Sequence, residues 1–115
     1  MLFRSYSLGM IDINRLLERG YVEIDHPLPE SRSFDNSKNN QVLVYIKENQ
    51  DKGNKTPYEY LGGVNNSKRW LDFVANVLSN KSYRDEKRNR LLRKDFGDKE
   101  AKGFREQKWP GKFEQ

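Results

Sequence analysis

The sequence predicts a small α+β domain, with a mostly antiparallel sheet of three or four strands, one or two covering helices, and a basic C-terminal helix and tail. Short segments in which apolar and polar residues alternate indicate the strands. Apolar residues spaced three and four apart over 68–78 indicate a helix lying across the sheet. All of the net positive charge falls after residue 80. A chain of 115 residues has room for one modest core.

Four segments are expected to be strands, namely 2–8, 21–25, 41–47 and 57–64. The run QVLVYIK at 41–47 is the strongest of them, and it is expected to form a hairpin with PYEYLGGV at 57–64 around a polar turn. Between the first two strands, Asp12 as N-cap and Gly20 as the closing residue predict a short helix. Residues 26–40 have loop composition, and a loop of this length is often functional.

Two helices are expected in the second half of the chain. In the first, Asn66 or Ser67 caps a helix whose apolar stripe faces the sheet. The stripe consists of Trp70, Phe73, Val74, Val77 and Leu78. The second runs from about 83 to 96, with Asp85 and Glu86 near the positive end of its dipole.

The charge distribution divides the chain into two parts. Residues 1–80 carry ten Lys and Arg against ten Asp and Glu, whereas residues 81–115 carry twelve against seven. We therefore expect an α+β core domain over 1–80 and a basic helix with a partly flexible tail over 81–115. A local positive field of this kind favours a polyanionic partner such as nucleic acid.

Several classes of protein are disfavoured by composition. The chain has no cysteine, which excludes disulfides, a thiolate nucleophile and Cys-based zinc sites. The opening MLFRSYSLGMIDI has no apolar run of signal-peptide length, and no stretch is apolar for long enough to span a membrane. We expect a cytoplasmic protein with no membrane contact and no cofactor.

The basic helix is the first candidate site, because cations at spacings of three and four share one helical face that can follow phosphates. Its candidate nucleic-acid contacts are Arg84, Lys87, Arg88, Arg90, Arg93 and Lys94. The alternative is a solvated helix in which these cations pair with neighbouring acidic residues. In the tail, Trp109 beside Lys108 offers an aromatic contact of the kind that single-stranded nucleic-acid binders use, or an anchor for the core or for a partner protein.

His26 is the one histidine, and it lies in the long loop beside Asp25 and Glu30. A general base or metal ligand is conceivable there, but no nearby Ser or Cys stands in a recognisable spacing. The carboxylates that could bind Mg²⁺ show no acidic pair or triad and are interpreted as surface residues. They are Asp25, Glu48, Asp51, Glu59 and Asp72.

Two resemblances concern binding modules. Residues 16–24, LLERGYVEI, resemble the end of a recognition helix running into the wing of winged-helix DNA-binding proteins. Residues 30–64 are similar to a C-terminal domain of unknown function in bacterial helicase-like proteins that carry a nuclease. The matching features are Ser31 and Ser33, the strand 42–48 and the segment 56–62. This second resemblance implies a β-rich module that works beside nucleic-acid enzymes.

A third resemblance, over residues 42–100, is to the GIY-YIG nucleases. The segment YEYLG at 58–62 looks like a family strand, Lys68-Arg69-Trp70 like the start of the Arg-bearing helix, and Phe96-Gly97 with Glu100 like a later segment. The resemblance implies that Tyr45 and Tyr60 are the motif tyrosines, that Arg69 stabilises phosphate charge and that Glu100 holds a divalent metal.

Taken together, these patterns favour a non-catalytic basic protein that binds nucleic acid or a nucleic-acid-processing complex through its C-terminal helix. One alternative is an interaction factor, an inhibitor or adaptor of a host enzyme of the kind that phages and mobile elements encode. Another is a metal-dependent nuclease of the GIY-YIG type. The choice between DNA and RNA, and the oligomeric state, stay open.

Overall fold

A β-hairpin with a helix packed against it forms the centre of the molecule. The computed structural model describes residues 3–94. Strand β1 (Val22–Asp25) pairs antiparallel with β2 (Val42–Tyr45), in a register that sets Glu23 opposite Val44. Helix α2 (Ile46–Lys52) follows β2 directly and packs back onto both strands. Because opposite residues share a face, Glu23 lies on the same side of the hairpin as the buried Val44.

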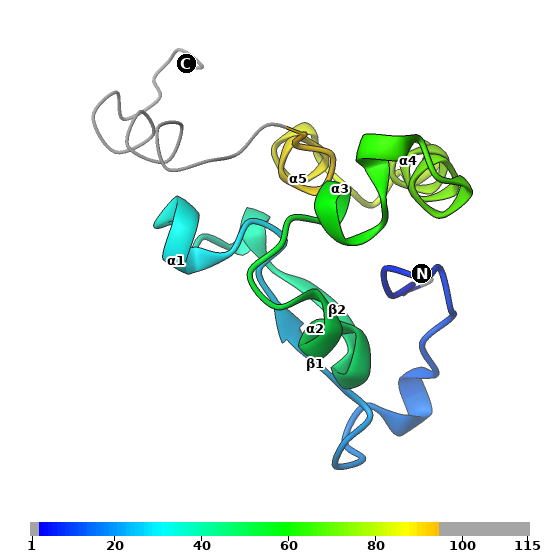
Figure 1. Ribbon diagram of the computed structural model, residues 1–115. Helices are drawn as coiled ribbons and strands as arrows, with labels where there is room; N and C mark the ends of the chain where they lie inside the picture. Colours follow the sequence, from blue (N-terminus) through cyan, green and yellow to red (C-terminus); the bar gives the residue numbers. More distant parts are fainter. Residues whose placement is uncertain (1–2, 95–115) are drawn as a thin grey trace.

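Four further helices complete the described fold. They are α1 (Glu30–Ser33), α3 (Pro57–Tyr60), α4 (Lys68–Ser79) and α5 (Asp85–Leu91), with short 3-10 turns at Ile13–Arg15, Lys38–Asn40 and Gly63–Asn65. Figure 1 shows α3, α4 and α5 gathered at one end of the molecule, while the hairpin and α2 extend toward the other. The two groups meet at the core.

Aromatic side chains build this core. Trp70 lies edge-on to Tyr58 at a centroid distance of 5.2 Å and contacts Phe73 at 6.0 Å, and Phe73 in turn contacts Tyr6 at 5.9 Å. The buried cluster comprises Tyr6, Val44, Leu61, Trp70, Phe73, Val77 and Leu91. The predicted helix over 68–78 is confirmed with one added residue, and Ser67 caps it by accepting a hydrogen bond from the Trp70 amide at 3.1 Å.

The predicted sheet of three or four strands is wrong, since the described residues form a sheet of two. The expected strand at 57–64 is α3 followed by a 3-10 turn. A capping box explains this outcome: the Thr56 hydroxyl accepts from the Glu59 amide at 3.1 Å, and the Glu59 carboxylate accepts from the Thr56 amide at 2.9 Å. Pro57 at the first helical position strengthens the helix start.

The remaining elements follow the prediction in part. The strand over 21–25 is confirmed as β1. It pairs with β2, which was predicted to pair with residues 57–64. In the segment predicted as a strand at 2–8, the described residues from 3 onward form no strand, and Arg4 makes an isolated bridge with Met10. The helix expected after Asp12 is a single 3-10 turn, and Leu17 beyond it is fully exposed.

The C-terminal helix is shorter than the predicted 83–96, ending at Leu91. Leu91 is only 2% exposed and belongs to the core cluster, so α5 packs onto the rest of the domain. The division of the chain near residue 80 stays a prediction. Among residues 3–94, no helix combines the length and apolarity that crossing a membrane requires.

Candidate active site

Asp25, the last residue of β1, lies at the centre of a buried polar cluster. Its side chain faces the core, and the residue is 8% exposed. Oδ2 accepts a hydrogen bond from the Tyr6 hydroxyl at 2.7 Å and forms an ion pair with Lys52 Nζ at 3.0 Å. A buried carboxylate needs such partners, because water is excluded from it. The contacts fix the orientation of the Asp25 side chain.

Lys52 reaches this carboxylate from the last turn of α2. Its side chain is fully buried, and Nζ also donates to the backbone oxygen of His26 at 3.1 Å. Burial lowers the pKa of Lys52 in spite of the opposing charge of Asp25. Burial, together with the Asp25 charge, raises the pKa of the Tyr6 phenol well above its ordinary value. The three groups form one interdependent polar cluster.

His26 follows Asp25 directly and is partly exposed. Lys52 holds its carbonyl, and the next residues, Pro27 and Leu28, are buried. Asn40 fixes Leu28 on both sides: the Leu28 amide donates to Asn40 Oδ1 at 2.9 Å, and Asn40 Nδ2 donates to the Leu28 carbonyl at 2.8 Å. The result is an accessible imidazole on a tightly held backbone.

Asn49 brings a third polar side chain to the same strand. It lies three residues before Lys52 on α2, so both project from one side of that helix. Its side-chain amide donates to the carboxylate of Glu23, two residues before Asp25 on β1. Helix α2 therefore sets Asn49 against Glu23 and Lys52 against Asp25.

These oxygen donors suit a small divalent cation. Within the described residues, no three His, Cys, Asp or Glu side chains gather as a complete metal cage. Mg²⁺, however, is usually held by one or two carboxylates, with water and substrate phosphate completing the coordination. Both described contacts of the Asp25 carboxylate fall on Oδ2, so Oδ1 is the atom placed to accept a cation. Asn49 brings a neutral amide oxygen to the same strand, since its side chain is held on Glu23 of β1.

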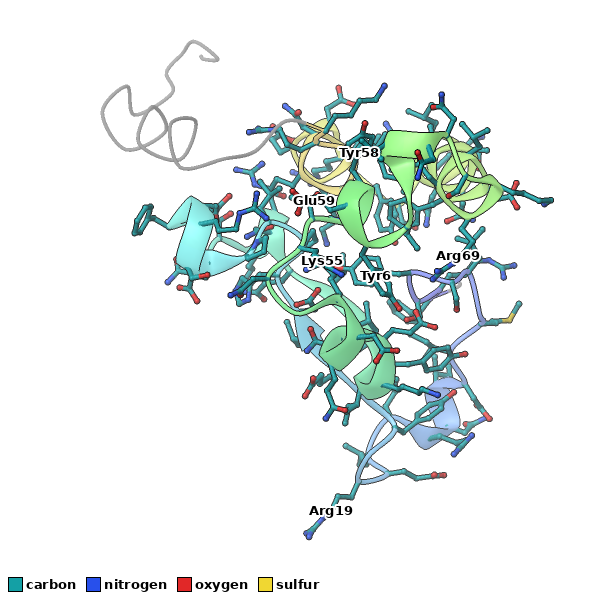
Figure 2. All side chains as sticks on the ribbon, viewed as in Figure 1. Tyr6, Arg19, Lys55, Tyr58, Glu59 and Arg69 are labelled. Atoms are coloured by element: carbon teal, nitrogen blue, oxygen red, sulfur yellow. The ribbon has the colours of Figure 1, made fainter. Side chains whose placement is uncertain are left out.

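The residues implied by the GIY-YIG resemblance take other positions. The Tyr45 ring packs on Tyr21 at 5.7 Å, and its hydroxyl donates to the Met10 carbonyl at 2.9 Å. Tyr60 lies edge-on to Tyr6, and the Arg69 guanidinium lies 5.3 Å from the Tyr60 ring centroid. Figure 2 shows Tyr6 in the interior of the molecule with Arg69 to one side of it. Glu100 lies outside the described residues.

The cations of α5 divide into two kinds. Arg88 donates to the carbonyl of Asn80 at 2.8 Å, and Arg90 pairs with Asp35 at 2.7 Å, so both hold the fold together. Arg84 and Lys94 are exposed, and Lys87 lies 5.8 Å from the Tyr83 ring centroid. Arg93 is partly exposed, and Trp109 lies outside the described residues.

Comparison with known proteins relates this chain to endonucleases. Residues 4–58 match the family model described as "HNH endonuclease", and this range contains the hairpin, α2 and all the residues of the polar cluster. The chain is related to the HNH nuclease domain of Cas9. We call residues 4–58 the HNH segment.

Individual relatives give the extent of the similarity. The chain is 43% identical over 75 residues to the CRISPR-associated endonuclease Cas9 of Staphylococcus aureus, and 44% identical over 81 residues to that of Campylobacter jejuni. These alignments cover 64% and 69% of this chain, but only 7% and 8% of the relatives. The chain thus spans less than a tenth of the length of the curated relatives it matches.

Solved structures agree with the sequence comparison. Streptococcus thermophilus Cas9 in complex with the GGAA PAM has a TM-score of 0.73 and 33% identity over 83% of this chain and 10% of its own. The same protein in complex with AGGA PAM gives 0.74 and 32%, with the same coverage. The similarity includes helices beyond the HNH segment, since it covers more of the chain than residues 4–58 do.

These findings correct both family resemblances inferred for residues 30–64 and 42–100. The HNH match over residues 4–58 overlaps the first resemblance over 30–58 and the second over 42–58, and the strands that they placed at 56–62 and 58–62 coincide with helix α3. The non-catalytic interpretation is also wrong, because the matching family consists of endonucleases. Of the hypotheses drawn from the sequence, the nuclease alternative agrees best in class, although its family was wrong.

Sequence reasoning undervalued His26 and did not single out Asn49, Lys52 or Tyr6. The available signal was an Asp-His pair at the end of a strand, followed by a second strand and a helix carrying Asn. This signal is hard to recognise around a lone histidine without Cys or Ser partners. The residues that gather at the Asp25–His26 pair, at positions 6, 49 and 52, are brought there only by folding.

Proposed function

We propose that this chain is the HNH nuclease part of a Cas9-like endonuclease and hydrolyses phosphodiester bonds of DNA with the aid of a divalent cation. The observation that carries the proposal is the Asp25–His26 junction, where a buried, oriented carboxylate adjoins an accessible imidazole. The relatives are named as endonucleases, and two solved structures hold a PAM, which supports DNA as the substrate.

His26 acts in this proposal as the general base. An imidazole is the side chain whose ordinary pKa lies closest to neutral pH, so His26 can take a proton from a water molecule that attacks the phosphorus. Lys52 holds the carbonyl of His26 and Asn40 holds Leu28 two residues further on, so the backbone that carries the His26 ring is fixed. Such positioning raises the rate by keeping the base in reach of the attacking water.

Asp25 and Asn49 are the residues that would hold the cation. When bound, a divalent cation supplies neutralisation of the charge that develops on the phosphate oxygens. The Tyr6 hydroxyl orients the Asp25 carboxylate by its hydrogen bond to Oδ2, and Oδ1 is then the oxygen that would hold the cation. Lys52, the second partner of Oδ2, holds the same carboxylate from the α2 side.

The exposed cations of the C-terminal helix are proposed as phosphate contacts that keep DNA on the domain. The described candidates lie in α5 or next to it; Arg84 and Lys94 are exposed, Lys87 and Arg93 are partly exposed, and Trp109 is an aromatic candidate further along the chain. Arg88 and Arg90 are excluded from this role as primary contacts because their guanidinium groups are engaged inside the fold. Electrostatic contacts of this kind supply affinity without reading sequence.

The test is a cleavage assay with the full chain in molar excess over end-labelled single- and double-stranded DNA, in Mg²⁺ and in EDTA. We expect cleavage in Mg²⁺ alone. His26→Ala should lower the cleavage rate at least about a hundredfold, the usual scale for loss of a general base, with an unchanged circular dichroism spectrum and unchanged DNA affinity. Glu30→Ala, an exposed change at the start of α1 four residues further on, is the matched control and should cleave normally.

Three outcomes would contradict the proposal. One is equal cleavage in EDTA and in Mg²⁺. Another is a His26→Ala variant that cleaves at the wild-type rate. The third is a wild-type chain that binds DNA in Mg²⁺ and leaves every strand intact.

A further inference from the structure

The ammonium group of Lys52 occupies the side of Asp25 that faces α2. The Lys52 side chain has 0% exposure and that of Asp25 has 11%, so this ion pair is formed away from water. Nζ lies 3.0 Å from Asp25 Oδ2, 3.1 Å from the His26 carbonyl oxygen and 5.7 Å from the centroid of the Tyr6 ring. All three neighbours favour a positive charge at this point.

We propose that Lys52 is the internal counter-ion of Asp25 in the metal-free protein and competes with the divalent cation for that carboxylate. The inference rests on the proposed function, because it concerns the same site. It assigns to Lys52 a role in setting metal affinity, besides its role in holding the backbone of His26.

The competition follows from charge and burial. A carboxylate with one positive partner is already neutralised, and a divalent cation on its other oxygen would stand a few ångströms from a buried ammonium. Like charges at that separation repel strongly, because little water screens them.

The second candidate ligand has an internal partner as well. Asn49 donates its side-chain amide to Glu23, which holds this side chain on β1 in the metal-free protein. Each oxygen donor on β1 is therefore matched by a donor group from α2, Lys52 for Asp25 and Asn49 for Glu23. These contacts between α2 and β1 stabilise the metal-free protein. In this proposal, a bound cation competes with the contact between Lys52 and Asp25.

The experiment measures Mn²⁺ affinity of the full chain without DNA, by electron paramagnetic resonance of free Mn²⁺ and by calorimetry. The variants are Lys52→Met, which removes the charge, and Lys52→Gln, which removes the charge and keeps a hydrogen-bond donor. Lys55→Met is the matched control, because it lowers the net charge equally at an exposed position three residues further along the chain. Asp25→Asn tests whether the measured Mn²⁺ is bound at this site.

We expect both Lys52 variants to bind Mn²⁺ about tenfold more tightly than the wild type or more, while Lys55→Met binds as the wild type does. Asp25→Asn should bind much more weakly. Without metal, Lys52→Met should melt at a lower temperature than the wild type, because Asp25 keeps a buried charge with no cation beside it. Saturating Mn²⁺ should then raise its melting temperature by more than it raises that of the wild type.

Equal or weaker Mn²⁺ binding by both Lys52 variants, with measurable binding by the wild type, overturns this inference and leaves the nuclease proposal standing. No Mn²⁺ binding by any variant contradicts the nuclease proposal too. If a Lys52 variant is unfolded without metal, thermal melting is measured again in the presence of Mn²⁺ to test the competition. Refolding on addition of Mn²⁺ supports the competition, and failure to refold at saturation overturns it.

Discussion

At the scale of single residues, Asn40 links the loop after His26 to the fold. The residue is fully buried, and its side chain forms hydrogen bonds with the Leu28 amide, the Leu28 carbonyl and, at 2.7 Å, the Asp35 carbonyl. Each bond satisfies a group that would otherwise be buried without a partner. One side chain thus replaces the backbone pairing that a loop of this length lacks.

We predict that Asn40→Ala lowers the free energy of unfolding by about 2–3 kcal/mol, since several buried polar groups lose their partner. Urea denaturation followed by circular dichroism measures this. The neighbouring Asn39, which is partly exposed, is the control, and Asn39→Ala should stay within about 0.5 kcal/mol of the wild type. Equal stability of the two variants would show that the Asn40 hydrogen bonds do not hold the loop after His26.

The candidate site was only partly predictable from the sequence, for a reason visible at this scale. His26 was considered as a general base without a recognised partner, and Asp25 was interpreted as a surface residue, which is wrong because it is 8% exposed. Asn49 and Lys52 were not singled out, because their partners on β1 lie 26 and 27 positions away in the sequence. A polar residue on a short helix gives no sign of its partner until the helix is placed on the strand.

At the scale of elements, the turn between α3 and α4 is packed without spare room. A Cβ atom at Gly63 would lie 2.1 Å from Cδ1 of Tyr58, and the same ring contacts Trp70 at the start of α4. The close approach of the backbone to the ring lets α3 and α4 share one aromatic cluster. A larger residue at position 63 has to displace that ring.

Gly63→Ala should therefore destabilise the protein by about 1–3 kcal/mol through overpacking. Gly20→Ala is the comparison, because position 20 has a φ of +85° with nothing within 4 Å of an added Cβ. There the cost is backbone strain alone, about 1 kcal/mol. In addition, Tyr58→Leu should reduce the cost of Gly63→Ala in a double mutant, and additive effects would argue against a direct clash.

Elements with a single strong signal were predictable, whereas those with two competing signals were not. The β-branched run at 42–45 and the apolar stripe of 68–79 formed the strand and the helix that their periodicity indicates. In 57–60 the alternating tyrosines suggest a strand, while Thr56, Pro57 and Glu59 specify a helix start, and the helix start prevailed. The strand predicted to continue to Lys47 ends early because Ile46 begins α2.

At the scale of the whole molecule, two ion pairs connect segments far apart in sequence. Arg90 of α5 pairs with Asp35 at 2.7 Å, and Arg32 of α1 pairs with Glu59 of α3 at 2.8 Å. Burial raises the pKa of Asp35, but hydrogen bonds from Arg90 and Ser37 outweigh it and leave the pKa lowered. Hydrogen bonding from Arg32 lowers the pKa of Glu59 against a smaller effect of burial.

Both carboxylates are more acidic in the folded protein than in the unfolded chain, so their contribution to stability is complete above their ordinary values of 3.8 and 4.5. We predict that the melting temperature falls as the pH drops through this region, when the folded state must take up protons. Asp35→Asn should melt lower than the wild type at pH 7 and should lose less on acidification. An acid-side slope identical to that of the wild type would show that Asp35 is not one of the groups responsible.

The two kinds of cation on α5 should separate in binding experiments. Arg84→Ala and Lys87→Ala should leave the melting temperature nearly unchanged and weaken DNA binding, with a reduced dependence on salt. Arg90→Ala should instead lower the melting temperature, because it leaves Asp35 without its guanidinium partner. Unaltered DNA affinity and salt dependence in the Arg84 and Lys87 variants would remove them from the proposed phosphate contacts.

The turn after Ile13–Arg15 has a practical use. Leu17 is completely exposed there, and Figure 2 shows Arg19 at the extreme tip of the molecule, at the other end from α3, α4 and α5. Exposed loop tips accept added sequence better than any buried segment does. A fluorophore or a fused protein attached at this turn would report on the movements of the domain while leaving His26 and its neighbours undisturbed.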